Sequence, residues 1–296
     1  MKVFYSPDYI AAKYSFDTTR KSEEVCDSLI DNPIAGVETV EPTPVHASQL
    51  ALIHDRDYID AVRTGHPKHL AESQGFAWDE GIWTATTAST GGMVDAALAA
   101  LEEGVAGTLS SGLHHARRNT GAGFCTFNGL SLAAILARDA GARDVLIVDF
   151  DAHGGGGTRS TASDNPHVWQ TDIAVSTFDD YDETDRFRYR FVMDPDTYLL
   201  ECEAALAEVD SLRDPQFDLV LYNAGMDPHE DCDVGGLTGI TTEVLAERER
   251  MVFEWAKNRD TPIAFTLAGG YANDVLTKER LVDLHRLTIS EAAQLD

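Results

Sequence analysis

Asp151 and His153 stand two residues apart, directly after an apolar segment of sequence VLIVDF. In an extended backbone, residues i and i+2 point to the same side, so this carboxylate and imidazole can bind one ion. Asp227 follows a second apolar segment, FDLVLY, and can supply a third ligand if the two segments form neighbouring strands. Three protein ligands and an open position for water are typical of catalytic zinc sites. The same donors also suit Fe²⁺ or Co²⁺, so they do not identify the metal.

A tandem histidine pair, His114 and His115, follows another short apolar segment at residues 105–109. Asp149 lies just before the Asp151 and His153 pair, and an imidazole beside a carboxylate has its tautomer and charge fixed. A general acid/base requires this arrangement. Both histidines could instead bind the metal, but the site would then have too many nitrogen ligands and no base.

Tyr271 follows Gly269 and Gly270, just after the apolar segment 263–267. Glycines allow turns that are closed to other residues, so they could direct the phenol into the same site. There a phenolic hydroxyl can donate to a developing oxyanion. The alternative is an aromatic ring that only caps the sheet.

The glycine run 154–157 lacks the lysine and the glycine spacing of nucleotide-binding loops, so we do not expect nucleotide binding.

All these groups follow predicted strands, and ligands bind at the carboxyl ends of the strands in an open parallel sheet. Hydrophobic patterning alternates strands with helices, which predicts an α/β fold with a mostly parallel sheet. The expected strands are 1–5, 105–109, 145–150, 173–175, 217–222 and 263–267. The expected helices are 47–64, 82–101, 130–138, 197–212, 241–257 and 275–293.

The composition predicts a single globular domain over residues 1–296 with an acidic surface. The chain has 50 acidic and 23 basic residues, six of them Lys and 17 Arg, and a net charge of −27. This charge repels phosphate groups, so we expect no direct contact with nucleic acid or with a membrane. A surface so acidic and poor in lysine resembles those of salt-adapted organisms; the alternative is an ordinary acidic bacterial protein.

The sequence also bears on the location of the protein. It has no apolar run long enough for a spanning helix or for the core of a signal peptide, so we expect a cytoplasmic protein. Its four cysteines are scattered, which indicates neither a disulfide framework nor a cysteine-rich zinc site. The oligomeric state cannot be predicted from these features.

Four segments together resemble the histone deacetylase and acetylpolyamine amidohydrolase family. They are HHARRNTGAGFCTFNGLSLAA at 114–134, VLIVDFDAHGGGGT at 145–158, VLYNAGMDPHEDCDVGGL at 220–237 and LAGGY at 267–271. The resemblance covers nearly the whole chain. It implies the arginase–deacetylase fold, a single-domain three-layer α/β/α structure.

The resemblance also implies roles for individual residues, grouped here by what they would bind or do. The matches to the metal ligands, which would hold zinc, are Asp151, His153 and Asp227. The matches to the catalytic groups are His114, His115, Asp149 and Tyr271, with His115 as general base and acid. The matches to the substrate-binding tunnel are Gly123, Phe124, Gly269 and Gly270. The matches to a monovalent cation site, for K⁺, are Asp149, Asp151, His153 and Ser176.

The implied activity is metal-dependent hydrolysis that removes an acyl group, above all acetyl, from a lysine side chain, a polyamine or a similar amine. One alternative is a dinuclear manganese ureohydrolase of the same fold, for which Gly154 and Gly155 offer no ligand to a second ion. The other alternative is a module that binds acyl-lysine without cleaving it. The complete catalytic set argues against that module.

Two glycines depart from the pattern of this family. Many members have a second histidine where Gly154 stands. Many have Asp or Asn where Gly156 stands, and that residue pairs with the second tandem histidine. We therefore expect His115 to lack this partner and to have a lowered pKa, unless another acidic group takes its place.

Overall fold

The structure is a computed structural model that describes residues 1–13, 17–212 and 217–295. Its centre is an eight-stranded sheet in the order β2-β1-β3-β8-β7-β4-β5-β6. The strands are β1 (Lys2–Phe4), β2 (Glu38–Val40), β3 (Val105–Thr108), β4 (Val145–Asp149), β5 (Val168–Ala174), β6 (Phe187–Phe191), β7 (Leu219–Ala224) and β8 (Ile263–Leu267). All recorded pairings between these strands are parallel, which confirms the predicted α/β class.

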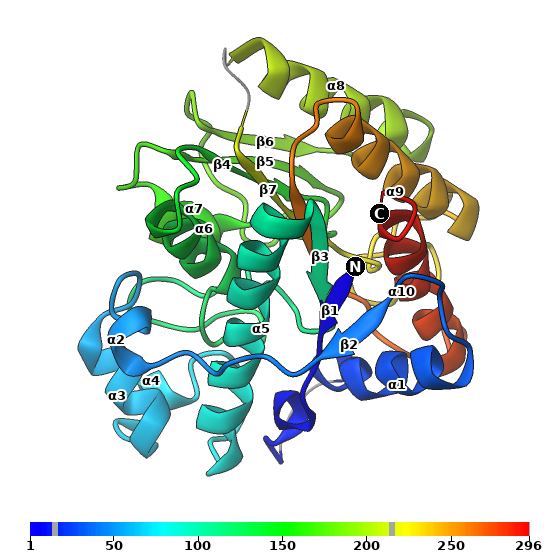
Figure 1. The fold of residues 1–296 in the computed structure, drawn as a ribbon. Coiled ribbons are helices and arrows are strands. Elements are labelled where there is room, and N and C mark those ends of the chain that lie inside the picture. The colour runs from blue at the N-terminus through cyan, green and yellow to red at the C-terminus, as the bar shows by residue number, and fades with distance from the viewer. Residues whose placement is uncertain (14–16, 213–216, 296) are drawn as a thin grey trace.

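Helices cover both faces of the sheet (Figure 1). One face carries α2 (Ala47–Leu50), α3 (Arg56–Thr64), α4 (Lys68–Ala71), α5 (Gly81–Glu103), α6 (Gly129–Asp139) and α7 (Gly156–Ala162). The other face carries α1 (Asp17–Asp31), α8 (Tyr198–Leu212), α9 (Thr242–Lys257) and α10 (Lys278–Ala292). Two short 3₁₀ helices, η1 (Pro7–Ile10) and η2 (Pro195–Thr197), complete the described elements.

Strand β4 shows how the sheet separates two hydrophobic cores. Val145 and Ile147 pack into the core under α3, α5 and α6, whereas Leu146 and Val148 pack into the core under α8, α9 and α10. Successive side chains of a strand point to opposite faces, so a strand buried on both faces must be apolar throughout. The architecture is therefore the predicted three-layer α/β/α arrangement.

Several expected elements have different bounds in the structure. The helix expected over 47–64 is two helices, because the chain turns after α2 and Asp55 takes an extended conformation at the start of α3. Strand β5 begins at Val168, earlier than the expected 173. Elements β2, β6, α1, α4 and α7 were not predicted.

Two further observations concern the whole described chain. Cys26, Cys125, Cys202 and Cys232 are buried and have free thiols. Within the described ranges, no helix combines the length and the apolar composition that crossing a bilayer requires.

Candidate active site

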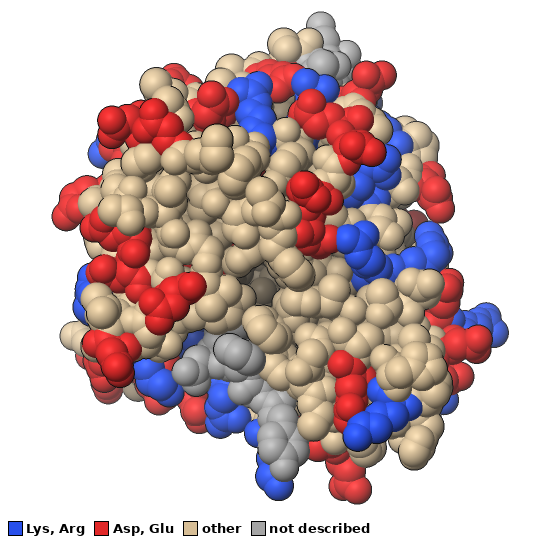
Figure 2. All heavy atoms as spheres, turned by 180° about the vertical axis from the view of Figure 1, so that it is seen from behind, with Lys and Arg blue, Asp and Glu red and all other residues tan. Residues whose placement is uncertain are grey.

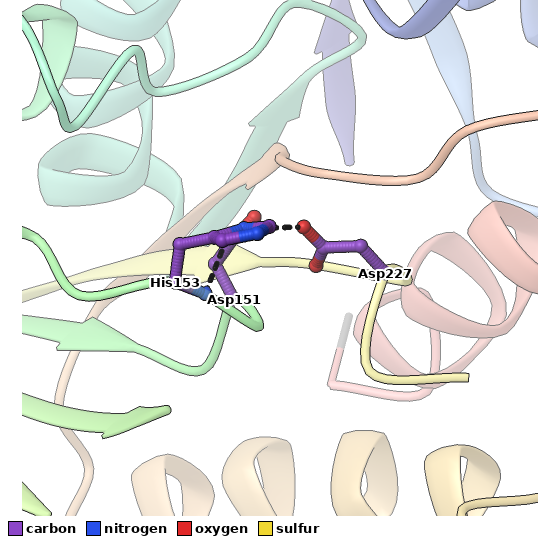
Figure 3. Close-up of side chains that lie close together, drawn as sticks. All are labelled: Asp151, His153 and Asp227. Atoms are coloured by element: carbon purple, nitrogen blue, oxygen red, sulfur yellow. Dashed lines mark hydrogen bonds and ion pairs between the residues drawn. The ribbon is translucent and has the colours of Figure 1, made fainter. Parts of the chain in front are cut away.

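The three predicted metal ligands lie together at the carboxyl end of the sheet. Asp151 and His153 follow β4, and Asp227 follows the neighbouring strand β7. One ligand atom from each residue lies within 4.8 Å of the others, and all three residues are buried. His153 Nδ1 is 3.1 Å from Asp151 Oδ1 and 3.1 Å from Asp227 Oδ2. Figure 3 shows Asp227 reaching from the loop after β7 toward the His153 ring.

The surroundings of these residues fit a divalent cation. Asp227 Oδ2 is fully buried, and apart from the His153 ring nitrogen 3.1 Å away it has no hydrogen-bond partner within the described chain. A Cβ at Gly269 would lie 2.0 Å from this oxygen and 2.5 Å from Asp151 Oδ2, so only glycine leaves the carboxylates room. Burial, and then the charge of Asp151, raises the pKa of Asp227. Two buried carboxylates so close together are stabilised by a cation between them.

His114 is held by two side chains from neighbouring strands. Its Nδ1 is 2.8 Å from Asp149 Oδ2, and Asn223 Nδ2 donates to Asp149 Oδ1 at 2.8 Å. His114 Nε2 is 3.6 Å from Asp151 Oδ1. Burial opposes a charge on His114, but the carboxylates of Asp149 and Asp151 outweigh it and raise its pKa to about 10. The predicted pairing of His114 with Asp149 is present.

His115 does have a carboxylate partner, so the expectation that it lacks one is wrong. His115 Nδ1 is 2.8 Å from Asp179 Oδ2, and Asp179 lies in the loop after β5. The pKa of His115 is nevertheless lowered, to about 4, because burial and the nearby charge of His114 outweigh Asp179. The environments of the two histidines therefore separate their pKa values, which is typical of catalytic acid/base pairs.

One cavity brings most of the predicted substrate-binding and catalytic residues together. Its walls include His114, His115, Gly123, Phe124, Asp151, Gly269 and Tyr271. Gly123 has φ of 49°, and a Cβ there would lie 2.4 Å from His115 Cδ2. Only glycine therefore leaves this side of the histidine ring open. Figure 2 shows a hollow in this structure near the middle of the face turned away in Figure 1, bordered mostly by uncharged residues.

Two aromatic rings stand beside this cavity. The rings of Phe124 and Tyr271 are 6.3 Å apart in an edge-to-face arrangement. Burial, and then the charges of Asp227 and Asp151, raises the pKa of Tyr271 well above its ordinary value, so its hydroxyl keeps its proton and can donate. Gly270, which was expected among the substrate-binding residues, faces Leu281 and His285 of α10 instead.

A second cavity adjoins the first and is lined mainly by apolar groups. The two cavities share Ser111, Leu113 and Phe124. The Gln74 side chain lines the second cavity, is buried, and has no hydrogen-bond partner within the described chain. This space lies beside the predicted reaction centre.

The predicted monovalent cation site remains a prediction. Ser176 N donates to the Ala152 carbonyl at 2.8 Å, so the segment after β5 lies against the loop that carries Asp151 and His153. Ser176 is therefore close in space to the three other predicted positions.

Sequence reasoning missed four residues of this site: Arg117, Phe178, Asp179 and Asn223. Phe178 is half-exposed, and its ring meets the His115 ring edge-on with centroids 4.9 Å apart. A signal was available, because Phe178 and Asp179 follow a strand just as the recognised groups do. Only Ser176 was selected from that segment.

Comparisons with known proteins give matches over most of the chain. The histone deacetylase domain model matches residues 15–285. An uncharacterized protein of Picosynechococcus is 30% identical over 281 residues, which cover 92% of this chain and 93% of that protein. Histone deacetylase 2 of Arabidopsis thaliana is 29% identical, over 92% of this chain and 74% of its own length.

Solved structures show the same fold. The acetylpolyamine aminohydrolase from Burkholderia pseudomallei superimposes with a TM-score of 0.83 at 18% identity, covering 100% of this chain and 99% of its own. The HDA15 HD domain superimposes with a TM-score of 0.78, also at 18% identity, covering 99% of this chain and 89% of its own.

Proposed function

The chain belongs to the histone deacetylase family, and we propose that it is a zinc-dependent hydrolase that removes acetyl or a related acyl group from an amine. One observation carries this proposal: the buried Asp151, His153 and Asp227 cluster adjoins a cavity lined by His115 and Tyr271. An acid/base group and an oxyanion donor beside a metal site are the components that amide hydrolysis needs. On this proposal, residues 1–296 form one catalytic domain.

Each polar group of the cavity has a task in this reaction. A divalent ion held by Asp151, His153 and Asp227 would polarise the amide carbonyl and lower the pKa of a water molecule. His115 is neutral at pH 7, and the contact of its Nδ1 with Asp179 leaves Nε2 to accept the proton of the attacking water. The same nitrogen then gives the proton to the departing amine. An acid/base group of this kind typically contributes about 10²–10⁴-fold to the rate.

Tyr271 stabilises the oxyanion of the tetrahedral intermediate. Its hydroxyl remains protonated because burial raises its pKa, so it can donate a hydrogen bond throughout the reaction. Gly269 contributes by keeping its backbone close: its N–H donates to Asp151 Oδ2 at 2.7 Å and holds this carboxylate in place.

The negative charge of the protein supports the proposed class of substrate. Deacylation releases a cationic amine, and a net charge of −27 attracts cations to the protein surface. Acetylated polyamines keep protonated amines near the scissile amide, and acetyl-lysine peptides carry positive charge there when the neighbouring residues are basic. Both are therefore candidate substrates. We also propose that the protein is cytoplasmic and comes from a salt-adapted organism.

A site for one metal ion distinguishes the proposed enzyme from a dinuclear manganese ureohydrolase. In residues 1–13, 17–212 and 217–295, one cluster of three potential ligands is close enough to hold an ion, and Gly154 and Gly155 offer no further donor side chain beside it.

A substrate panel tests the proposed function. The purified protein is loaded separately with Zn²⁺, Fe²⁺ or Mn²⁺ and assayed on acetyl-lysine peptide, acetylated polyamine, longer acyl-lysines and guanidino compounds. Release of acetate or a longer acid, lost on chelation, supports the proposal. Urea release with Mn²⁺, or binding of acyl-lysine without turnover under any of the three metals, would contradict it.

A further inference from the structure

Asp179 reaches the active site from a loop that the histidine and metal-ligand motifs do not include. It stands five residues after the end of β5, in the left-handed backbone conformation with φ of 61°. Its side chain is 5% exposed, although the loop itself is at the surface. A left-handed aspartate is uncommon, so this backbone conformation needs support from its neighbours.

Each oxygen of the Asp179 carboxylate is engaged. Oδ2 lies 2.8 Å from His115 Nδ1 and accepts from the Gly157 N–H at 3.1 Å. Oδ1 accepts from Arg117 Nη2. Three donors around one carboxylate fix its position, and hydrogen bonds to a charged group are the stronger kind. The carboxylate in turn fixes the rotation of the His115 ring.

The space for Asp179 exists because positions 154 and 156 have no side chains. A Cβ at Gly156 would lie 2.6 Å from Asp179 Oδ1 and 2.7 Å from its carbonyl oxygen. A Cβ at Gly154 would lie 2.6 Å from the same carbonyl oxygen. The two glycines also hold the loop, because Gly156 N–H donates to the Asp179 carbonyl and Gly154 N–H to the Phe178 carbonyl.

We propose that Asp179 is the positioning residue for His115. The absence of side chains at Gly154 and Gly156 leaves the space that Asp179 occupies. The carboxylate keeps the proton of His115 on Nδ1 and leaves Nε2 facing the reaction. This inference rests on the proposed function for its kinetic consequence but not for the pairing itself. Arg117 donates to the other oxygen of this carboxylate, Oδ1, and helps to hold it.

Asp179→Ala tests the pairing, and Asp180→Ala is its matched control. Asp180 is the next residue of the same loop, is exposed, and carries the same charge. The first readout is the tautomer of His115 in metal-free protein, measured by long-range ¹⁵N–¹H NMR. The signals of the His115 ring are assigned by their absence from His115→Ala. We expect the Nδ1–H form in wild type and in Asp180→Ala, and a mixture of tautomers in Asp179→Ala. An unchanged tautomer in Asp179→Ala would overturn the proposal.

The second readout is kinetic. In the zinc-loaded enzyme, Asp179→Ala should lower kcat by about 10²-fold, because the acid/base group is misplaced, and should change KM by less than about threefold, because Asp179 does not line the cavity. In a His115→Ala background the same substitution should change kcat by less than about threefold. Additive losses, or an equal loss in Asp180→Ala, would show that Asp179 acts on stability rather than on His115.

Asp179→Asn covers the case in which the alanine variant does not fold. It preserves volume, but its amide can accept on one side only, so either Arg117 or His115 loses its acceptor. We expect kcat to fall at least about tenfold with the melting temperature nearly unchanged. If wild type turns over no acylated amine, the proposed function fails, and the NMR tautomers still decide the role of Asp179.

Discussion

Gly156→Asp should damage the enzyme rather than improve it, although it creates the residue found at this position in many relatives. The new Cβ would lie 2.6 Å from Asp179 Oδ1 and 2.7 Å from the Asp179 carbonyl oxygen. Ordinary contact begins near 3.4 Å, so the loop would have to retreat by about 0.7 to 0.8 Å. The carbonyl also accepts from Gly156 N–H at 3.1 Å, so a retreat breaks this hydrogen bond as well.

The magnitude follows from the crowding and from the bonds that it breaks. Overpacking in a tight site destabilises by about 1–3 kcal/mol, and loss of the backbone hydrogen bond from Gly156 N–H by about 0.5–1.5 kcal/mol. With partial relaxation we expect a total loss of about 2–4 kcal/mol, which corresponds to a fall in melting temperature of about 3–6 °C for a chain of this length. The kcat should fall because Asp179 no longer positions His115.

The assay compares Gly156→Asp, Gly156→Ala and the double variant Gly156→Asp with Asp179→Ala by thermal melting and by kcat. Gly156→Ala introduces the Cβ without a charge and should be destabilised as well. The double variant removes the 2.6 Å contact with Oδ1 but keeps the contact with the carbonyl, so it should be destabilised by less than the sum of the single changes. A Gly156→Asp protein with wild-type melting temperature and kcat would refute this reasoning.

Three further predictions concern the phenol, a buried histidine and the surface charge. Tyr271→Phe should lower kcat by about 10²–10³-fold with metal content unchanged, and a loss below threefold would remove the phenol from the mechanism. Burial lowers the pKa of His54 to about 4, below its unfolded value near 6.5, so the folded state favours the neutral ring and loses stability as pH falls from about 6.5 toward 4. Between pH 7.5 and pH 5, urea denaturation should therefore show a loss of stability that is larger by about 2 kcal/mol in wild type than in His54→Gln; equal pH dependence in both proteins would contradict this. Because about 1 M salt shortens the Debye length to about 3 Å, the melting temperature should rise with KCl, and a steady fall would contradict the salt-adapted reading.

The central strands were predictable because their physical signal is local. Residues 145–148 are apolar and β-branched or leucine throughout, as a strand buried on both faces requires. Strand β6 was missed although Arg188 and Arg190 alternate along it as on one face of a strand, because alternating arginines also suit a solvent-exposed segment. Their charges are paired with Glu208 and Glu201 of α8, and the sequence pattern does not reveal this pairing. Helix α1 was missed because it buries few apolar side chains, among them Val25 and Leu29.

The metal cluster was predictable because parallel strands place their carboxyl ends at one edge of a sheet. Once β4 and β7 are neighbours, Asp151, His153 and Asp227 must approach one another. The partner of His115 was not predictable in this way. Its position depends on a left-handed loop and on space left by two glycines, neither of which hydrophobic patterning reports.

The most direct test of the account is a titration of metal-free protein with Zn²⁺, followed by deacylation of an acetyl-lysine peptide at each step. Asp151, His153 and Asp227 form one three-ligand cluster, so activity should rise linearly and reach its plateau at one equivalent of zinc per chain. In Asp227→Ala the metal and the activity should be lost together. A plateau at two equivalents, or a protein that binds one equivalent and cleaves no acylated amine, would contradict a mononuclear amide hydrolase.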